Sequence, residues 1–266
     1  MEIRNSRIDG GKAFDWGKTS SDYAKYRDIY PDIFYQKIVQ RGLCVQGQKV
    51  LDLGTGTGVL PRNMYRFGAE WTGIDISEEQ IREAVRLSGS AGMKIRFQAC
   101  SAEAVSFEEQ SFDTVTACQC FWYFDHEKLS PVLSRILKDE GRLAVLFMGW
   151  LPYEDKIAKA SEDLVLKYNP KWTGAGETKH PIRIKDAVLR WFEIEDHEEY
   201  DLEVPFTKES WHGRMRACRG VGASLSESEL SGWEKEHRAL LNEIAPEEFT
   251  IHHYAAIAVL KKKNRI

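Results

Sequence analysis

Short apolar runs alternate with amphipathic stretches through the first 150 residues. The apolar runs predict buried strands at 48–53, 69–76, 93–99, 111–118 and 142–150. The amphipathic stretches predict helices at 58–68, 77–89 and 126–141, the second capped by Ser77. Strands that alternate with helices form a parallel sheet covered on both faces, so the pattern predicts an α/β fold.

The alternation changes after Trp150. Helical patterns occupy 154–168, 207–220 and 226–244, and strand patterns occupy 191–206 and 250–263, with a turn-rich loop at 169–181. The acidic run EIEDHEEYDLE (193–203) predicts a solvated strand edge that discourages aggregation. On the last strand His252 and His253 alternate, so at most one of them points inward.

Composition narrows the possible settings of the protein. The 266 residues are 42% hydrophobic and 29% charged, with a net charge of −4, which permits an ordinary core and gives no global reason to expect nucleic acid. We see neither a signal-peptide pattern nor a run long enough to span a bilayer, and we expect a cytoplasmic protein. The five scattered cysteines contain no C-x-x-C pair, so neither a disulfide scaffold nor a metal site is expected.

The stretch VLDLGTGTGVL (50–60) joins a predicted strand to a predicted helix through a glycine loop. A phosphate-binding P-loop would need a lysine directly after its last glycine, and Val59 follows Gly58. The dinucleotide pattern G-x-G-x-x-G would need its third glycine at Val59, so its spacing is wrong as well.

Two aspartates indicate which ligand the loop suits. Asp52 lies just before the loop, where a carboxylate disfavours a pyrophosphate and favours a positively charged ligand such as S-adenosylmethionine. Asp75 ends the second strand, where it can accept hydrogen bonds from ribose hydroxyls, as also happens with nicotinamide cofactors. The alternative for Asp75 is a simple cap before Ser77.

In order, the motifs VLDLGTGTG, GIDIS, SAEAV, SFDTVTACQCFWYFD and ILKDEGRLAVLFM resemble those of class I S-adenosylmethionine-dependent methyltransferases over residues 48–149. The chain is most similar to the small-molecule branch with the trans-aconitate and quinone-biosynthesis enzymes. The resemblance implies a Rossmann-like, mostly parallel seven-stranded sheet with an antiparallel last strand and helices on both faces. We predict one domain, with an N-terminal lid and first helix (1–47), a cofactor-binding core (48–150) and a substrate-side insertion with closing strands (151–266).

The resemblance also implies roles for single residues. Those expected around the methionine end of the cofactor are Asp52, Gly54, Thr55, Gly56, Gly58 and Gln119. Those expected around its nucleoside are Asp75, Ile76, Ser101, Ala102 and Glu103, with Ser101 where the family usually has an aspartate. In the N-terminal segment, Tyr23 and Arg27 are placed near the methionyl carboxylate, and the alternative is a surface helix.

Methyl transfer is an in-line displacement that depends mainly on alignment and on exclusion of water. The candidates for a catalytic role are His126 and His212; His126 could instead simply start a helix. The candidates for the acceptor site are Trp16, Trp122, Phe124, Arg216, Arg219 and His253. On a helix His212, Arg216 and Arg219 would share one face, which could bind an anion or be a solvated basic face.

The sequence therefore predicts an enzyme that methylates a small molecule, with a carboxylate-type acceptor favoured and S-adenosylhomocysteine as product. We expect a monomer or homodimer that binds neither nucleic acid nor membrane. Three alternatives stay open: a nicotinamide-dependent oxidoreductase, an RNA or protein methyltransferase, and a non-catalytic cofactor-binding regulator.

Overall fold

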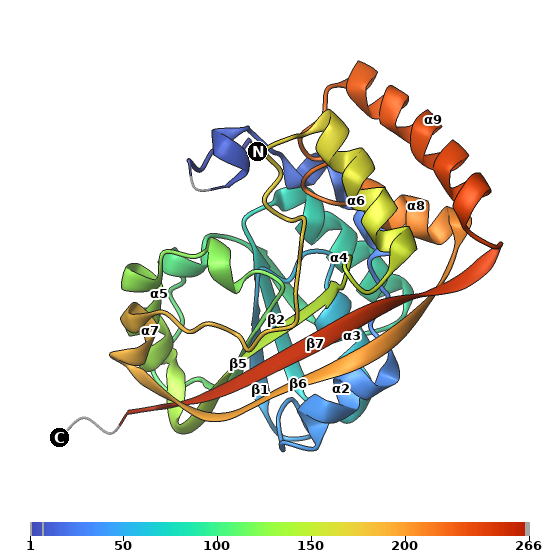
Figure 1. Ribbon diagram of the computed structural model, residues 1–266. Coiled ribbons are helices and arrows are strands. Elements are labelled where there is room, and N and C mark those ends of the chain that lie inside the picture. The colour runs from blue at the N-terminus through green and yellow to red at the C-terminus, as the bar shows by residue number, and fades with distance from the viewer. Residues whose placement is uncertain (1, 7, 264–266) are drawn as a thin grey trace. The chain divides into compact units, whose positions relative to one another are not determined.

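The computed structural model describes residues 2–6 and 8–263 (Figure 1). Its seven strands form one sheet in the order β3-β2-β1-β4-β5-β7-β6, with six strands parallel and β7 antiparallel. The predicted Rossmann-like α/β fold is therefore confirmed. By its internal contacts the chain divides into two compact units. Unit 1 is Met1–Ile29, Gly149–Lys179 and Asp201–Tyr254, and unit 2 is Tyr30–Met148, His180–Tyr200 and Ala255–Ile266. The single-domain interpretation stays a prediction.

Unit 2 contains five of the six parallel strands. They are β1 (Lys49–Leu53), β2 (Glu70–Asp75), β3 (Arg96–Ala99), β4 (Phe112–Cys118) and most of β5 (Leu137–Trp150). Its helices are α2 (Asp32–Val39), α3 (Val59–Met64), α4 (Glu78–Ser90), α5 (His126–Ile136) and α7 (Asp186–Leu189). Short 3₁₀ turns occupy Tyr65–Phe67, Ala102–Ala104 and Phe121–Tyr123. The edge strand β6 (Phe192–Thr207) and β7 (Glu248–Lys262) begin in one unit and end in the other.

Strand burial explains why unit 2 forms around β1 and β4. Apart from Lys49, every residue of β1 is buried, because β2 and β4 pair with it on either side. Strand order reverses here, since β1 leads to β2 and β3 on one side and to β4 on the other. In open α/β sheets a ligand binds at the carboxyl ends of the strands beside such a reversal. The fold therefore directs attention to Gly54 and the residues after it.

Unit 1 contains the N-terminal segment and a group of helices. These are α1 (Ser20–Tyr26), α6 (Lys156–Tyr168), α8 (Lys208–Arg216) and α9 (Glu227–Ile244), preceded by 3₁₀ turns at Asp9–Gly11 and Trp16–Thr19. Helix α1 packs on α8, and α6 and α9 lie side by side (yellow and red-orange in Figure 1). Serine and threonine caps begin α8 and α9 as full capping boxes.

Two predicted helix ends are wrong. The helix predicted at 126–141 ends at Ile136, because buried Leu137 pairs with Phe112 of β4 and begins β5. The register of β4 on β5 then shifts, so Gly141 lies within a bulged strand and does not end a helix. Helix α8 ends at Arg216, which leaves Arg219 outside it. The acidic run 193–203 does form an edge strand, as predicted.

Candidate functional site

The glycine loop follows β1 at the reversal of strand order. Gly54 has a φ of +58°, and a Cβ there would lie 2.9 Å from the Cys120 side chain. Gly58 has a φ of +74° and precedes α3, and a Cβ there would lie 2.9 Å from the Phe97 ring. Both positions need glycine for conformation and for space. The loop is therefore bare backbone packed on its neighbours, and Gly54 and Gly56 remain partly exposed in it.

Asp75 holds the loop from the end of β2. Its Oδ2 accepts a hydrogen bond from the Gly56 backbone N–H and its Oδ1 accepts one from the Ser77 N–H, both at 2.9 Å. Asp75 therefore does act as a cap before Ser77, which was the alternative interpretation of this residue. Burial raises the pKa of the carboxyl, although these backbone donors act in the opposite direction. Each carboxylate oxygen has a further lone pair, so ribose hydroxyls could still be bound.

Asp52 is the buried acid of the site, with an exposed fraction of 2%. Its Oδ1 accepts a hydrogen bond from the Thr116 hydroxyl of β4 at 2.6 Å. Burial raises its pKa to about 7, and Asp75 adds to this shift. A buried acid beside a bare loop fits a group with positive charge, and fits a phosphate poorly.

The sequence did not single out Thr116. A β-branched residue within an apolar strand is ordinary, so no local signal distinguishes it from the neighbouring Thr114.

The residues predicted around the nucleoside lie after β2 and β3. The Ser101 hydroxyl donates a hydrogen bond to one carboxylate oxygen of Glu103. The other oxygen of Glu103 accepts a hydrogen bond from the Asp125 backbone N–H at 2.9 Å. Ala102 is buried, whereas Ile76 is 46% exposed. An exposed isoleucine beside Asp75 is a suitable surface for a flat apolar ring. The roles of these residues remain predictions.

Gln119 follows β4 with a φ of +67°, which is unusual for a residue other than glycine. Its backbone N–H donates to Leu146 at 2.9 Å, and its side-chain amide donates to the Met148 carbonyl. These contacts hold the strained backbone at the carboxyl end of β4, where strain often marks a functional position.

The aromatic segment after Gln119 separates into buried and exposed rings. Phe121 is 3% exposed and Trp122 is 41% exposed, and the Trp122 ring meets Phe147 of β5 edge to face at 5.3 Å. Phe124 packs on the core of unit 2 and approaches Gly54, so both acceptor-site candidates lie on the carboxyl side of the sheet. His126 is buried, its ring 4.4 Å from Phe121. Burial, followed by the charge of Lys185, lowers the pKa of His126.

The residues of the predicted lid form a chain of contacts within unit 1. The Arg27 guanidinium donates to the Tyr23 hydroxyl at 2.8 Å and lies 4.5 Å from that ring. Trp16 meets Tyr23 edge to face at 6.0 Å. These contacts fix the position of the Arg27 guanidinium, as a group that binds the methionyl carboxylate would need. The role of Arg27 remains a prediction.

The predicted basic face of His212, Arg216 and Arg219 does not exist. His212 is 2% exposed, because it lies beneath α9 with its Nδ1 2.9 Å from the His237 Nδ1. Arg216 forms ion pairs with Asp22 and Glu234. A single helical pattern could not show this, since the covering helix comes later in the chain.

Arg219 has a buried carboxylate partner. Its Nε lies 2.8 Å from Asp9, whose exposed fraction is 0%. The pair fastens the N-terminal segment within unit 1. The proposal that this arginine binds an acceptor would require it to leave that partner.

His253 is the inward-pointing member of the histidine pair, as predicted, with an exposed fraction of 1%. Its Nδ1 lies 2.8 Å from the Ile251 carbonyl, so Nδ1 carries the proton and donates, and Nε2 carries a lone pair. Nε2 has no hydrogen-bond partner among the described residues. Its ring stacks on Phe206 and meets Trp150 edge to face.

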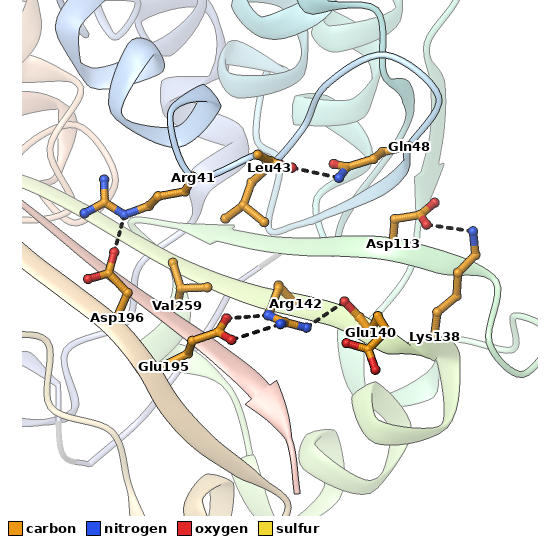
Figure 2. A pocket seen from close by; sticks show the side chains of 11 residues that line it. Arg41, Leu43, Gln48, Asp113, Lys138, Glu140, Arg142, Glu195, Asp196 and Val259 are labelled. Atoms are coloured by element: carbon orange, nitrogen blue, oxygen red, sulfur yellow. Dashed lines mark hydrogen bonds and ion pairs between the residues drawn. The ribbon is translucent and has the colours of Figure 1, made fainter. Parts of the chain in front are cut away.

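A cavity of about 420 Å³ lies at the opposite ends of the strands in unit 2 (Figure 2). Its charged side chains face one another as ion pairs, including Arg41 with Asp196, Lys138 with Asp113, and Arg142 with Glu195. A ligand would have to displace these partners, so the cavity is not the site that the motifs predict.

Within the described part of the chain, no group of three or more histidine, cysteine, aspartate or glutamate side chains is arranged to hold a metal ion. The same residues include no helix long and apolar enough to cross a membrane.

Comparison with known proteins assigns the glycine-loop region to a family. Residues 50–141 match the family model described as a methyltransferase domain. The ubiquinone biosynthesis O-methyltransferase of Xanthomonas euvesicatoria pv. vesicatoria is 29% identical over 137 residues, which are 51% of this chain and 57% of that relative. The enzyme of the same name from Pseudomonas entomophila is 26% identical over 163 residues, or 60% of this chain and 69% of the relative. The chain thus spans little more than half the length of the Xanthomonas relative.

Solved structures share the fold. A protein described as a putative type II methyltransferase from Anaeromyxobacter dehalogenans matches with a TM-score of 0.56 and 17% identity, over 87% of this chain and 95% of that one. The YcgJ protein of Bacillus subtilis matches with a TM-score of 0.54 and 19% identity, over 88% of this chain and 100% of that one. At such identities the likeness concerns the fold alone. The shared fold, the match over residues 50–141 and the glycine loop with its two acids all indicate the same family. This part of the chain is a class I S-adenosylmethionine-dependent methyltransferase domain.

Proposed function

We propose that this protein transfers a methyl group from S-adenosylmethionine to an oxygen atom of a small-molecule acceptor. The observation that carries the proposal is the bare loop between two acids, with buried Asp52 on one side and, on the other, Asp75, whose carboxylate accepts the Gly56 backbone N–H. The cofactor, when bound, supplies a methyl group activated by a positively charged sulfur. Oxygen is favoured over other acceptor atoms because the relatives at 26–29% identity are named O-methyltransferases.

The residues of the chain would bind and orient the reactants. Asp75 would hold the ribose, while the loop from Gly54 would let the methionine portion approach the backbone. Trp122, exposed after β4, would cover one side of the acceptor and exclude water from it. Alignment and dryness supply most of the acceleration in such a displacement.

The two arginines predicted to bind a carboxylate-type acceptor do not support that prediction in this structure. Arg216 and Arg219 already lie against carboxylates of unit 1, so binding an anion there would mean replacing those partners.

Binding and transfer can be tested separately. S-adenosylmethionine and S-adenosylhomocysteine should raise the melting temperature of the full chain, whereas NADH should not. Incubation with radiolabelled donor and panels of hydroxylated and carboxylated small molecules should label a hydroxylated one. Stabilisation by NADH alone would contradict the proposal, as would transfer of label only to carboxylates or to RNA. The variant Trp122→Ala should raise KM for the acceptor and leave donor affinity unchanged.

A further inference from the structure

One carboxylate joins two loops that come from opposite sides of the reversal of strand order. Glu103 lies in the turn after β3, and Asp125 lies in the segment after β4. In the sheet these two strands are separated by β2 and β1. One carboxylate oxygen of Glu103 accepts the Asp125 backbone N–H at 2.9 Å, and the other accepts the Ser101 hydroxyl. Glu103 therefore bridges the carboxyl ends of the strands around the glycine loop.

On the side of β3, the bridge begins next to Asp75. The Cys100 backbone N–H donates to the Asp75 carbonyl at 2.9 Å, and Ser101 is the next residue. A serine before a helical turn usually accepts a hydrogen bond from the N–H groups of that turn. The Ser101 side chain forms no such cap, and its hydroxyl donates to Glu103 instead. The serine oxygen keeps a lone pair for a ligand, so a ligand held beside Asp75 would contact Glu103 through Ser101.

On the side of β4, the segment 120–125 is held at both of its ends. At its start the Cys120 thiol donates to the Leu53 carbonyl at 3.0 Å, directly before the glycine loop. At its end Asp125, which caps α5, is held by Glu103. Trp122 lies between the two attachments and is 41% exposed. The position of its ring beside the glycine loop therefore depends on Glu103 as well as on Cys120.

We propose that Glu103 is a positioning residue for methyl transfer, which orders the segment that carries Trp122 when the methyl donor occupies the site. The inference rests on the proposed function, since it takes the edge beside Asp75 to be where the nucleoside binds. A bound nucleoside would restrict Ser101, which would restrict the Glu103 carboxylate and so hold Asp125. A ligand that orders one loop lowers the entropic cost of ordering the loop joined to it. Donor binding should therefore precede acceptor binding and favour it.

Hydrogen exchange of the full chain, followed by mass spectrometry, measures this ordering without knowledge of the acceptor. The probe is S-adenosylhomocysteine at a saturating concentration. Peptides that cover 119–126 report on the segment, including the Tyr123 N–H, which donates to the Cys120 carbonyl at 3.0 Å. We expect the bound probe to slow exchange of this segment by about tenfold, the factor that one added hydrogen bond can supply. Peptides from the buried strand β4 serve as the internal reference.

Two substitutions of Glu103 separate the bridge from the mere presence of a side chain. Glu103→Ala removes both hydrogen bonds, so it should speed exchange of the segment and abolish the slowing by the probe. Glu103→Gln can keep both bonds, because its amide oxygen can accept the Asp125 N–H and its amide N–H can donate to Ser101. This variant should restore the behaviour of the parent. Calorimetry should find the affinity for S-adenosylhomocysteine within about threefold of the parent in both variants.

The matched control is Glu109→Ala, which removes an exposed carboxyl group on the next loop. Within the described part of the chain this carboxyl group has neither a hydrogen bond nor an ion pair. The control should exchange like the parent, with and without the probe.

Ser101→Ala cuts the bridge on the nucleoside side alone. It keeps the bond to Asp125, so exchange without ligand should stay near that of the parent, whereas the slowing by the probe should be lost. This variant decides if Glu103→Ala does not fold. Equal slowing in the parent and in either alanine variant would overturn the inference, as would Glu103→Gln behaving like Glu103→Ala. Absence of S-adenosylhomocysteine binding to the parent would instead contradict the proposed function.

Discussion

Asp9 in unit 1 and Asp52 in unit 2 are both buried aspartates, with exposed fractions of 0% and 2%, yet their pKa values move in opposite directions. Burial acts to raise the pKa of both. Around Asp9, hydrogen bonds from Arg219 and Thr173 outweigh burial, and its pKa is lowered. Around Asp52, Thr116 and Thr55 do not outweigh burial, and its pKa rises to about 7.

The difference distinguishes a structural acid from a site acid. Asp9 has all the donors that a buried carboxylate needs, so it stabilises the fold as an anion. Among the residues that the structure describes, Asp52 has no cationic partner, and the fold tolerates that deficit at a position where a positively charged ligand would remove it. Strongly perturbed acids at the edge of a cleft are therefore useful guides to function, provided that their partners are counted first.

The largest expected effect comes from removing the partner of Asp9. Arg219→Ala should lower the free energy of unfolding by about 3–5 kcal/mol at pH 7, because it leaves a buried carboxylate unpaired. Urea titration followed by circular dichroism measures the loss. Arg86→Ala breaks the exposed pair with Glu83 and should cost less than about 1 kcal/mol. A similar small loss for both variants would break the comparison.

The opposite sign is expected at Asp52. Its folded pKa exceeds that of the unfolded chain, so its ionisation destabilises the fold as pH rises from about 4 to about 7. Asp52→Asn should therefore raise the free energy of unfolding of the ligand-free protein at pH 8, by up to about 4 kcal/mol. At pH 4 the variant and the parent should be equal. Denaturant titrations at both pH values measure the gain, and a loss of stability at pH 8 would contradict it.

A separate dependence on acidic pH is expected from the buried histidines of unit 1. Burial lowers the pKa of His212 to about 4 and that of His237 to about 3. Below pH 6.5 the unfolded chain therefore binds more protons than the folded chain. As the pH decreases, the free energy of unfolding should fall by about 1.4 kcal/mol per pH unit for each histidine that stays neutral in the fold. Thermal unfolding between pH 4 and 7 tests this slope. His237→Gln should reduce it, and an unchanged slope would show that these rings do not control acid stability.

Much of unit 2 could be predicted from the sequence, because the information is local. The apolar run before the loop, the glycine spacing and the end of the second strand at Asp75 each lie within a window of a few residues. The boundary between α5 and β5 could not, since Leu137 leaves the helix to pair with Phe112. Thr116 was missed for a related reason: its importance comes from a contact with Asp52 across 64 positions.

By itself, the sequence determined the order of strands and helices, the bare loop at the reversal of strand order, and the acids beside it. Only the tertiary structure decided which charged groups have partners. Periodicity and turn chemistry are written in neighbouring residues, so they can be identified before folding. Charge pairing joins residues as distant as Asp9 and Arg219, which lie 210 positions apart. Burial then decides whether a carboxyl group that lacks such a partner keeps its proton.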